Sequence, residues 1–163
     1  HGGSLRIYAK HQGNERYAES KKVKDLLAKE YQAGVASLDF YSNFSDSVQR
    51  IKLDFLSFLI EQKRKGKIVG AYGAAAKGNT LLNYCGIRSD MIAFVADANP
   101  HKQHKYLPGS HIPVVDEYYL KEIRPDFVII FPWNIKEEIM DQLSYIREWG
   151  CKFVIPVPML QIL

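Results

Sequence analysis

The chain has 163 residues, of which 47% are hydrophobic, 25% charged and 12% aromatic. This composition indicates one ordinary domain with enough apolar material for a core, and it excludes disordered and collagen-like proteins. No apolar run approaches the roughly 20 residues that a membrane span needs. Residues 1–20 lack the apolar stretch of a signal peptide, so we expect a cytoplasmic protein with no membrane partner. The net charge is +4, and we interpret the basic excess within residues 1–65 as solvated helix faces.

The first 66 residues predict one short strand and a helical hairpin. Residues 5–9 alternate apolar and polar side chains, which is typical of a strand. Apolar residues at helical spacing predict a helix over about 19–32, ending at Gly34. A second apolar stripe predicts a longer helix over about 38–65, ending at Gly66.

The rest of the chain, residues 67–163, alternates short apolar runs with helical patterns. Predicted strands cover residues 68–72, 92–95, 127–131 and 153–156, and predicted helices lie around Thr80, around Tyr119 and over residues 136–148. The run 127–131 is apolar at every position, as expected of a parallel strand that helices cover on both faces. We expect an α/β fold with a doubly wound, mostly parallel sheet, and the N-terminal strand and hairpin packed on it in a single domain.

No metal site is predicted. Cys85 and Cys151 each stand alone, without a second cysteine or a histidine pair at zinc-binding spacing, which indicates buried thiols in a reducing compartment. The basic loop after the second predicted strand carries His101, His104 and His111, but without rigid spacing or paired carboxylates. Hydrogen-bonding or exposed histidines are therefore favoured over metal ligands.

Ligands of open α/β sheets bind at the carboxyl ends of the strands, so the strand exits are the places to search. The first exit reads Gly73-Ala-Ala-Ala-Lys77-Gly78-Asn79. Its small residues, its lysine and the start of a helix suit a phosphate group. The spacing is neither GxGxxG nor GxxxxGK[ST]. Phosphate binding and a tightly packed turn remain equal alternatives here.

Two further exits carry candidate residues. Asp97 stands where nucleotide-binding folds place a carboxylate for a ribose hydroxyl, and the alternative is a helix cap or Asx-turn before Pro100. Trp133 offers a flat ring for stacking, with packing as the alternative, and Asn134 offers an amide that can cap the next helix. No hydrolase elbow, paired catalytic carboxylates or Cys/His pair is found, so we assign no catalytic residue and favour a binding domain.

Five segments in a fixed order carry a resemblance to a known family. They are His1-Gly-Gly-Ser-Leu-Arg6, the stretch from Gly70 to Gly86, Asp97-Ala-Asn-Pro-His-Lys-Gln103, Leu107-Pro-Gly-Ser-His-Ile-Pro113 and Pro132-Trp-Asn134. Together they resemble the C-terminal domain of S-adenosylmethionine-dependent sugar C-methyltransferases, which act on nucleotide-linked ketosugars of deoxysugar pathways. The resemblance spans the whole chain and implies a Rossmann-like fold that helps to hold the nucleotide sugar.

The resemblance also implies roles for individual residues. His1 and Arg6 would contact the sugar or its diphosphate, with a structural role in a glycine-rich turn as the alternative. The remaining implied binding residues are Lys77 and Asn79 for the phosphates, Asp97, Lys102 and His111 for the nucleotide end, and Gly73, Gly78 and Trp133 around them.

The family places its S-adenosylmethionine domain and its catalytic Glu-His motif before the His-Gly-Gly-Ser segment. We therefore expect this chain to hold no cofactor itself, to act with an N-terminal methyltransferase domain, and to be inactive alone. The implied chemistry is carbon methylation beside a sugar ketone, in which a base removes the acidic proton and the stabilised enolate attacks the methyl group.

A rival hypothesis is a stand-alone nucleotide- or NAD(P)-binding Rossmann-like regulatory domain, such as a CoA-binding-like module. It would use the same sheet and the same turn at Gly73. The segment 107–111 belongs to the methyltransferase resemblance and has no role in dinucleotide binding that we can name, so it favours the methyltransferase. A nucleic-acid-binding domain would rest only on the basic first 65 residues and would bind with strong salt dependence. We expect a nucleotide-linked sugar as the partner and no nucleic acid.

Overall fold

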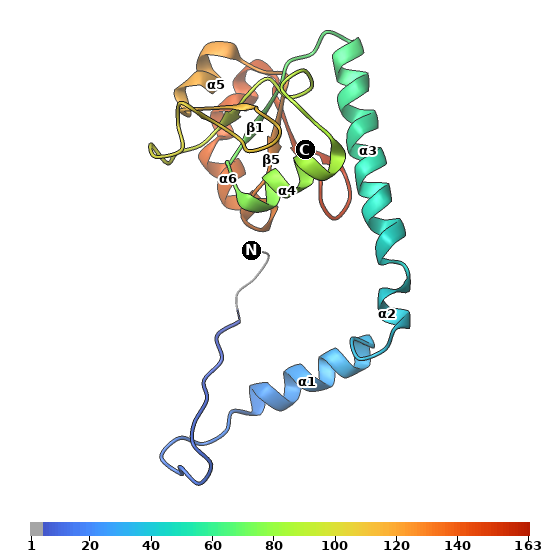
Figure 1. The fold of residues 1–163 in the computed structure, drawn as a ribbon. Helices are drawn as coiled ribbons and strands as arrows, with labels where there is room; N and C mark the ends of the chain where they lie inside the picture. Colours follow the sequence, from blue (N-terminus) through green and yellow to red (C-terminus); the bar gives the residue numbers. More distant parts are fainter. Residues whose placement is uncertain (1–4) are drawn as a thin grey trace. The chain divides into compact units, whose positions relative to one another are not determined.

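The computed structural model describes residues 5–163, and the chain divides into two compact units. One unit runs from Ser4 to Gln49 and the other from Arg50 to Leu163. Figure 1 shows their secondary structure elements along the chain. None of the helices among the described residues combines the length and the apolar character that crossing a bilayer requires.

The unit from Ser4 to Gln49 is built from helices. It contains α1 (Lys21–Ala33), α2 (Asp39–Ser42) and the first residues of α3 (Phe44–Arg64). The predicted end of the first helix is confirmed, because Gly34 has a φ of 79° and donates its backbone N–H to the last carbonyls of α1. None of the side chains of residues 5–49 is buried.

Two expectations for the N-terminal part are wrong. Residues 5–10 form no strand, and Leu5 and Ile7 are 70% and 79% exposed. An alternating pattern becomes a strand only when another strand supplies hydrogen-bond partners, and no strand among the described residues pairs with this segment. The long helix predicted over 38–65 is interrupted at Asn43, where the backbone leaves the helical region with a ψ of 5°.

The unit from Arg50 to Leu163 is built around a seven-stranded sheet of order β3-β4-β2-β1-β5-β6-β7. Its strands are β1 (Val69–Tyr72), β2 (Val95–Ala96), β3 (Lys105–Tyr106), β4 (Pro113–Val115), β5 (Phe127–Ile130), β6 (Lys152–Ile155) and β7 (Gln161–Ile162). The five central strands are parallel, and the short outer strands β3 and β7 pair antiparallel. The expected α/β fold with a mostly parallel, Rossmann-like sheet is confirmed.

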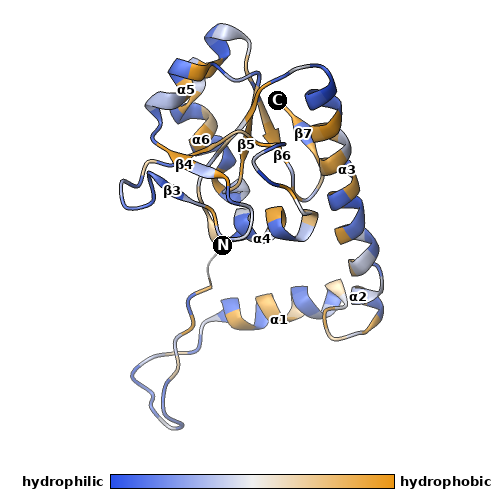
Figure 2. Cartoon of the chain, turned by 45° about the horizontal axis from the view of Figure 1, so that its top comes forward, coloured by the Kyte–Doolittle hydropathy of each residue, from blue (hydrophilic) through white to orange (hydrophobic). Residues whose placement is uncertain are grey.

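Helices cover both faces of this sheet. One face packs against α3 and α4 (Ala76–Cys85), through buried residues such as Phe55, Leu59 and Leu82. The other face packs against α5 (Tyr118–Ile123), α6 (Lys136–Gln142) and the 3₁₀ helix η2 (Ser144–Trp149). Figure 2 shows β5 and β6 in the colour of apolar residues. The continuous apolar run over 127–131 thus reports a strand that is buried on both sides, as expected.

Three boundaries in this unit differ from the prediction. The helix expected over 136–148 is α6 followed by η2, with a break at Leu143. The strand expected over 92–95 is confined to Val95–Ala96. Strands β3, β4 and β7 were not predicted, because pairings of two or three residues carry too little periodicity to be recognised. Both cysteines, Cys85 and Cys151, are buried and unpaired.

Candidate functional site

The candidate site lies at the carboxyl ends of β1 and β5. These two strands are neighbours, with Ala71 paired to Ile129, whereas the connection through α4 leads from β1 to β2 on its other side. The strand order therefore reverses between β1 and β5. In open α/β sheets this switch point is where the exits diverge and leave a crevice for a ligand.

The turn between β1 and α4 requires its two glycines. Gly73 has a φ of +87°, and a Cβ there would lie 2.5 Å from ring carbons of Pro132. A Cβ at Gly78 would lie 2.5 Å from Cγ of Phe131. Both predicted glycines therefore let the turn and α4 pack closely on the exit of β5. The turn differs from a GxGxxG motif only by Ala75 at the second glycine position.

Helix α4 begins without a side-chain cap. Its N-cap residue is Ala75, which has no group to accept the N–H hydrogens of the first turn. Asn79, in the same first turn, has a buried side-chain oxygen with no hydrogen-bond partner. The free N–H groups of this first turn are donors that suit an anion, whereas the unpartnered oxygen of Asn79 is an acceptor and does not add to them.

Lys77 of α4 reaches the exit of β5. Its ammonium lies 4.7 Å from the ring centroid of Trp133, on the 3₁₀ helix η1 (Trp133–Ile135), and donates a hydrogen bond to Oδ1 of Asn134. Partial burial of the ammonium lowers the pKa of Lys77 from its ordinary value. Within residues 5–163, Lys77 makes no ion pair with a carboxylate. The structure thus brings two predicted residues, Lys77 and Trp133, together at the switch point.

Asp97 follows β2 and is fastened within the protein. Its Oδ2 accepts the backbone N–H of Ala74 at 2.7 Å, and its Oδ1 accepts the N–H of Asn99 at 2.8 Å. Lys102 forms an ion pair with Oδ2 at 3.2 Å and donates to the carbonyl of Ala74 at 3.0 Å. The Asx-turn alternative is therefore present in the geometry, and both predicted residues brace the β1–α4 turn.

The remaining predicted residues lie elsewhere. His111 is exposed in the loop before β4, with a φ of 56°. Arg6 belongs to the unit from Ser4 to Gln49, where it donates to the hydroxyl of Tyr8 at 3.5 Å. His1 lies outside the described residues. The three loop histidines form no cluster, and no group of three or more potential metal ligands is found in the described part of the chain.

Sequence reasoning missed two contributors to the site. Asn134 was assigned only a helix cap, but its side-chain oxygen accepts from Lys77. Asn83 of α4 donates to the carbonyl of Pro108 at 3.0 Å and fastens the loop before β4 to the helix. The signal for Asn134 was available in principle, because a doubly wound sheet brings the first exit beside the third.

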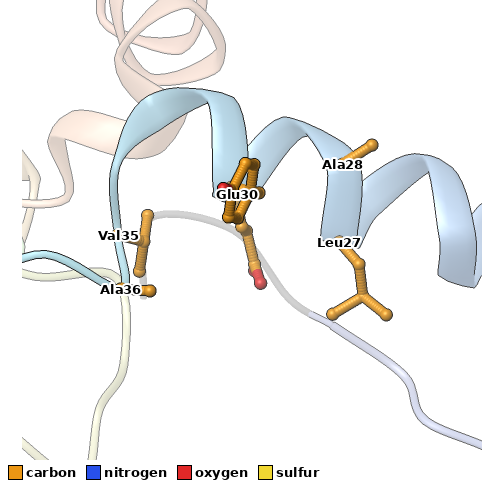
Figure 3. Close-up of a pocket in the computed structure, with 6 residues that line it drawn as sticks. Leu27, Ala28, Glu30, Val35 and Ala36 are labelled. Carbon is orange, nitrogen blue, oxygen red and sulfur yellow. The ribbon is translucent and has the colours of Figure 1, made fainter.

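A hollow lies in the unit from Ser4 to Gln49, at the end of α1 (Figure 3). It is lined by Leu27, Ala28, Glu30, Tyr31, Val35 and Ala36. Glu30 is the one charged residue of this lining, and its other members bring no convergent set of polar groups. The hollow lacks the few converging polar groups that orient a ligand, so we place the candidate site at the switch point.

Comparison with known proteins identifies similar chains. A family model described as the C-methyltransferase C-terminal domain matches residues 1–158. C-methyltransferase NovU from Streptomyces niveus is 32% identical over 158 residues, covering 97% of this chain. The chain spans 37% of the length of that relative. Among solved structures, UDP-D-quinovosamine 4-dehydrogenase from Vibrio fischeri aligns with a TM-score of 0.41 at 15% identity, over 60% of this chain and 93% of its own.

Proposed function

Because the chain belongs to the C-methyltransferase C-terminal domain family, we propose that it binds the nucleotide-linked sugar of an S-adenosylmethionine-dependent C-methyltransferase. The methylated carbon would lie next to the ketone of that sugar. The relative NovU is itself named a C-methyltransferase, and this chain aligns with 37% of its length. The proposed partner is accordingly an N-terminal methyltransferase domain.

One observation carries the proposal: Lys77, Trp133 and the uncapped start of α4 meet at the switch point. Backbone N–H groups and an ammonium suit a diphosphate. An aromatic ring beside them suits the flat face of a base or the apolar face of a sugar. A diphosphate joined to a ring on each side is the common core of nucleotide-linked sugars.

The geometry favours this ligand over NAD(P). The carboxylate that would accept a ribose hydroxyl is Asp97, which already accepts three donors from Ala74, Asn99 and Lys102. A carboxylate whose two oxygens are already occupied weighs against the regulatory dinucleotide-binding domain.

The proposed roles of this chain are binding and orientation. Lys77 would hold the diphosphate through a charge-assisted hydrogen bond, and Trp133 would limit the tilt of the ring beside it. When bound in the longer enzyme, S-adenosylmethionine supplies the electrophilic methyl group. The saturated Asp97 leaves this crevice without a carboxylate for the ribose of that cofactor, so we assign its binding to the methyltransferase domain.

Calorimetric titration of the chain with a thymidine diphosphate sugar and with NAD tests the proposal. We expect the sugar nucleotide to bind in about the high-micromolar to millimolar range, since half of a two-domain cleft offers limited contact area. Lys77→Ala should weaken that binding about tenfold to a hundredfold, because one charge-assisted contact is lost. Tighter binding of NAD would favour the regulatory domain, and unchanged affinity in Lys77→Ala would remove the phosphate site.

The matched control is Lys105→Met, which deletes a lysine whose ammonium is bonded only to the carbonyl of His101 at 2.6 Å. Its affinity should equal that of the unchanged chain. We also expect no methyl transfer by the chain alone. Turnover of S-adenosylmethionine by the pure chain would contradict the assignment of the methyl-donor site to another domain.

A further inference from the structure

The backbone of Ala74 is held by side chains at both of its peptide bonds. Its N–H donates to Oδ2 of Asp97 at 2.7 Å, and its carbonyl accepts from Nζ of Lys102 at 3.0 Å. The two flanking turn residues bond only to backbone, with the N–H of Gly73 on the carbonyl of Ala96 at 2.8 Å and the N–H of Ala75 on the carbonyl of Gly73. Side chains thus fix the turn at one residue, Ala74.

Asp97 is placed to act on the turn and has little capacity left for a ligand. Its side chain is buried, and three donors occupy its two oxygens. The backbone of Asp97 is fixed as well, because its carbonyl accepts the side-chain amide of Gln103 at 2.9 Å. Through these bonds Asp97, which follows β2, fixes the position of the turn after β1 relative to β2.

Lys102 differs from Lys77 in its electrostatics. The charge of Lys102 is balanced by Asp97 at 3.2 Å, so the pair as a whole adds little attraction for an anion. Lys77 has an amide and an aromatic ring as partners, and its positive charge is not balanced by a carboxylate among the described residues. Lys77 therefore offers a positive charge to an anion, and Lys102 holds the backbone of the turn.

We propose that Asp97 and Lys102 are positioning residues, which set the backbone of Ala74 and thereby aim the first turn of α4 and Lys77 at the ligand without touching it. This inference rests on the proposed function, because it concerns the same ligand. The turn ends one residue before α4 begins at Ala76, so a rotation at Ala74 redirects the free N–H groups of the helix. The family resemblance implies that both residues line the nucleotide end, with an Asx-turn as the alternative for Asp97.

A double-mutant cycle separates positioning from contact. The variants are Lys102→Met, Asp97→Asn and the double variant, each titrated calorimetrically with uridine diphosphate and thymidine diphosphate well below its melting temperature. Each single variant should bind about fivefold to tenfold more weakly. The double variant should bind no more weakly than the worse single variant, since the two side chains are paired with each other and both changes release the backbone of the same residue.

Two control variants make the same Lys→Met and Asp→Asn changes at residues that do not contact Ala74. Lys105→Met removes a lysine three residues further along the chain, at the start of β3. Asp116→Asn removes a carboxylate that follows the neighbouring strand β4 and accepts only the N–H of Tyr119 at 3.2 Å. Neither should alter affinity. The ¹H–¹⁵N signal of Ala74 supplies a readout that needs no ligand. It should move in Lys102→Met and stay in place in both controls.

The outcomes distinguish this inference from the proposed function. If the unchanged chain binds neither diphosphate, the proposed function fails and the positioning role falls with it. If the chain binds, Lys77→Ala weakens binding, and Lys102→Met does not, only the positioning role is overturned. Additive losses in the double variant, with an unmoved Ala74 signal, would mean that Lys102 contacts the ligand directly and would overturn the inference as well.

Discussion

Helix α3 runs through two regions that differ in how far they bury their apolar side chains. Its apolar stripe recurs at one spacing along the helix, yet Phe44 at its start is 69% exposed and Phe55, eleven residues later, is fully buried. The same contrast holds between the two units. Residues 50–163 enclose a core on both faces of a sheet, and residues 5–49 bury no side chain.

The comparison teaches what an amphipathic pattern specifies. The spacing of apolar residues identifies the face of a helix that can be buried, and it does so equally well in α1 and in α3. Burial itself depends on what else the chain brings to that face. In residues 50–163 the sheet supplies that surface, and Phe58 packs edge-on against Phe127 of β5 with ring centroids 5.3 Å apart.

The contrast along α3 gives the largest expected effect. Phe55→Ala should lower the free energy of unfolding of the sheet-containing unit by about 3–5 kcal/mol, because it leaves a cavity in the core. Phe44→Ala is the matched control, with the same chemical change in the same helix, and should cost less than about 0.5 kcal/mol. Chemical denaturation followed by circular dichroism measures both. Equal losses would show that both ends of the helix are packed.

Glycines with positive φ give the next largest contrast. Gly73→Ala should destabilise by about 2–4 kcal/mol, because a left-handed backbone is strained by a side chain and the new Cβ would overlap Pro132. Gly86→Ala has a similar φ of +73° with no atom within 4 Å, so it should cost only the strain, about 1 kcal/mol.

Gly13→Ala extends this comparison to the other unit. Gly13 also has a positive φ, of +82°, and open space around it. If residues 5–49 do not unfold together with the sheet, this change should leave the denaturation midpoint of the sheet-containing unit unmoved. A midpoint shift as large as that of Gly86→Ala would contradict the separation of the two regions.

The sequence was sufficient where local signals and tertiary structure agree. The strand at 127–131 is recognisable because every residue is apolar, and the end of α1 because Gly34 can adopt a left-handed backbone. The strand expected at residues 5–9 failed because pairing is not a local property. β3 and β7 consist of two residues each, which leaves no pattern to recognise.

In the candidate site, too, the sequence predicts single residues but not how the fold brings them together. Gly73, Lys77 and Trp133 were predicted one at a time, since each follows a strand. Their meeting depends on β1 and β5 being neighbours, which sequence spacing does not reveal. For Asp97, the sequence offered a ligand contact and an Asx-turn as alternatives. The choice needed the position of Ala74, which lies 23 residues earlier in the chain.

A smaller difference in stability is expected between the buried hydroxyl of Tyr72 and the exposed hydroxyl of Tyr8. The hydroxyl of Tyr72 in β1 donates to Glu117 and accepts from Gln142 at 2.9 Å. Burial, reinforced by Glu117, raises the pKa of Tyr72 well above its usual range, so the phenol stays neutral. Tyr72→Phe should lower the free energy of unfolding by about 1–2 kcal/mol, measured by urea denaturation, because Glu117 and Gln142 lose a partner.

Tyr8→Phe is the control for this change in the other unit. Tyr8 is 83% exposed, and its hydroxyl has only a long hydrogen bond of 3.5 Å from Arg6. Its removal should change the free energy of unfolding by less than about 0.5 kcal/mol. A loss equal to that of Tyr72→Phe would mean that both hydroxyls are structurally engaged.

The smallest expected effect is the pH dependence contributed by Asp126. Burial alone would raise the pKa of this carboxyl, but the hydrogen bonds from Lys67 at 2.8 Å and from the N–H of Ile68 outweigh it, and the pKa is lowered. Because the pKa is lower in the folded chain, the carboxylate stabilises the fold at pH values above its pKa in the unfolded chain, which is about 3.9. That contribution disappears as the pH falls through the folded value.

Asp126→Asn should therefore be less stable than the unchanged chain at pH 7, by less than about 1 kcal/mol because solvent screens the partly exposed ion pair. The difference should shrink below pH 4 and vanish once the carboxyl of the unchanged chain is protonated. Asp25→Asn, on exposed α1, is the control and should follow the unchanged chain at every pH. Urea denaturation between pH 2 and pH 7 measures these differences. A pH-independent loss in Asp126→Asn would trace the stabilisation to side-chain shape, because protonation of Asp126 changes its charge and its hydrogen bonding but not its shape.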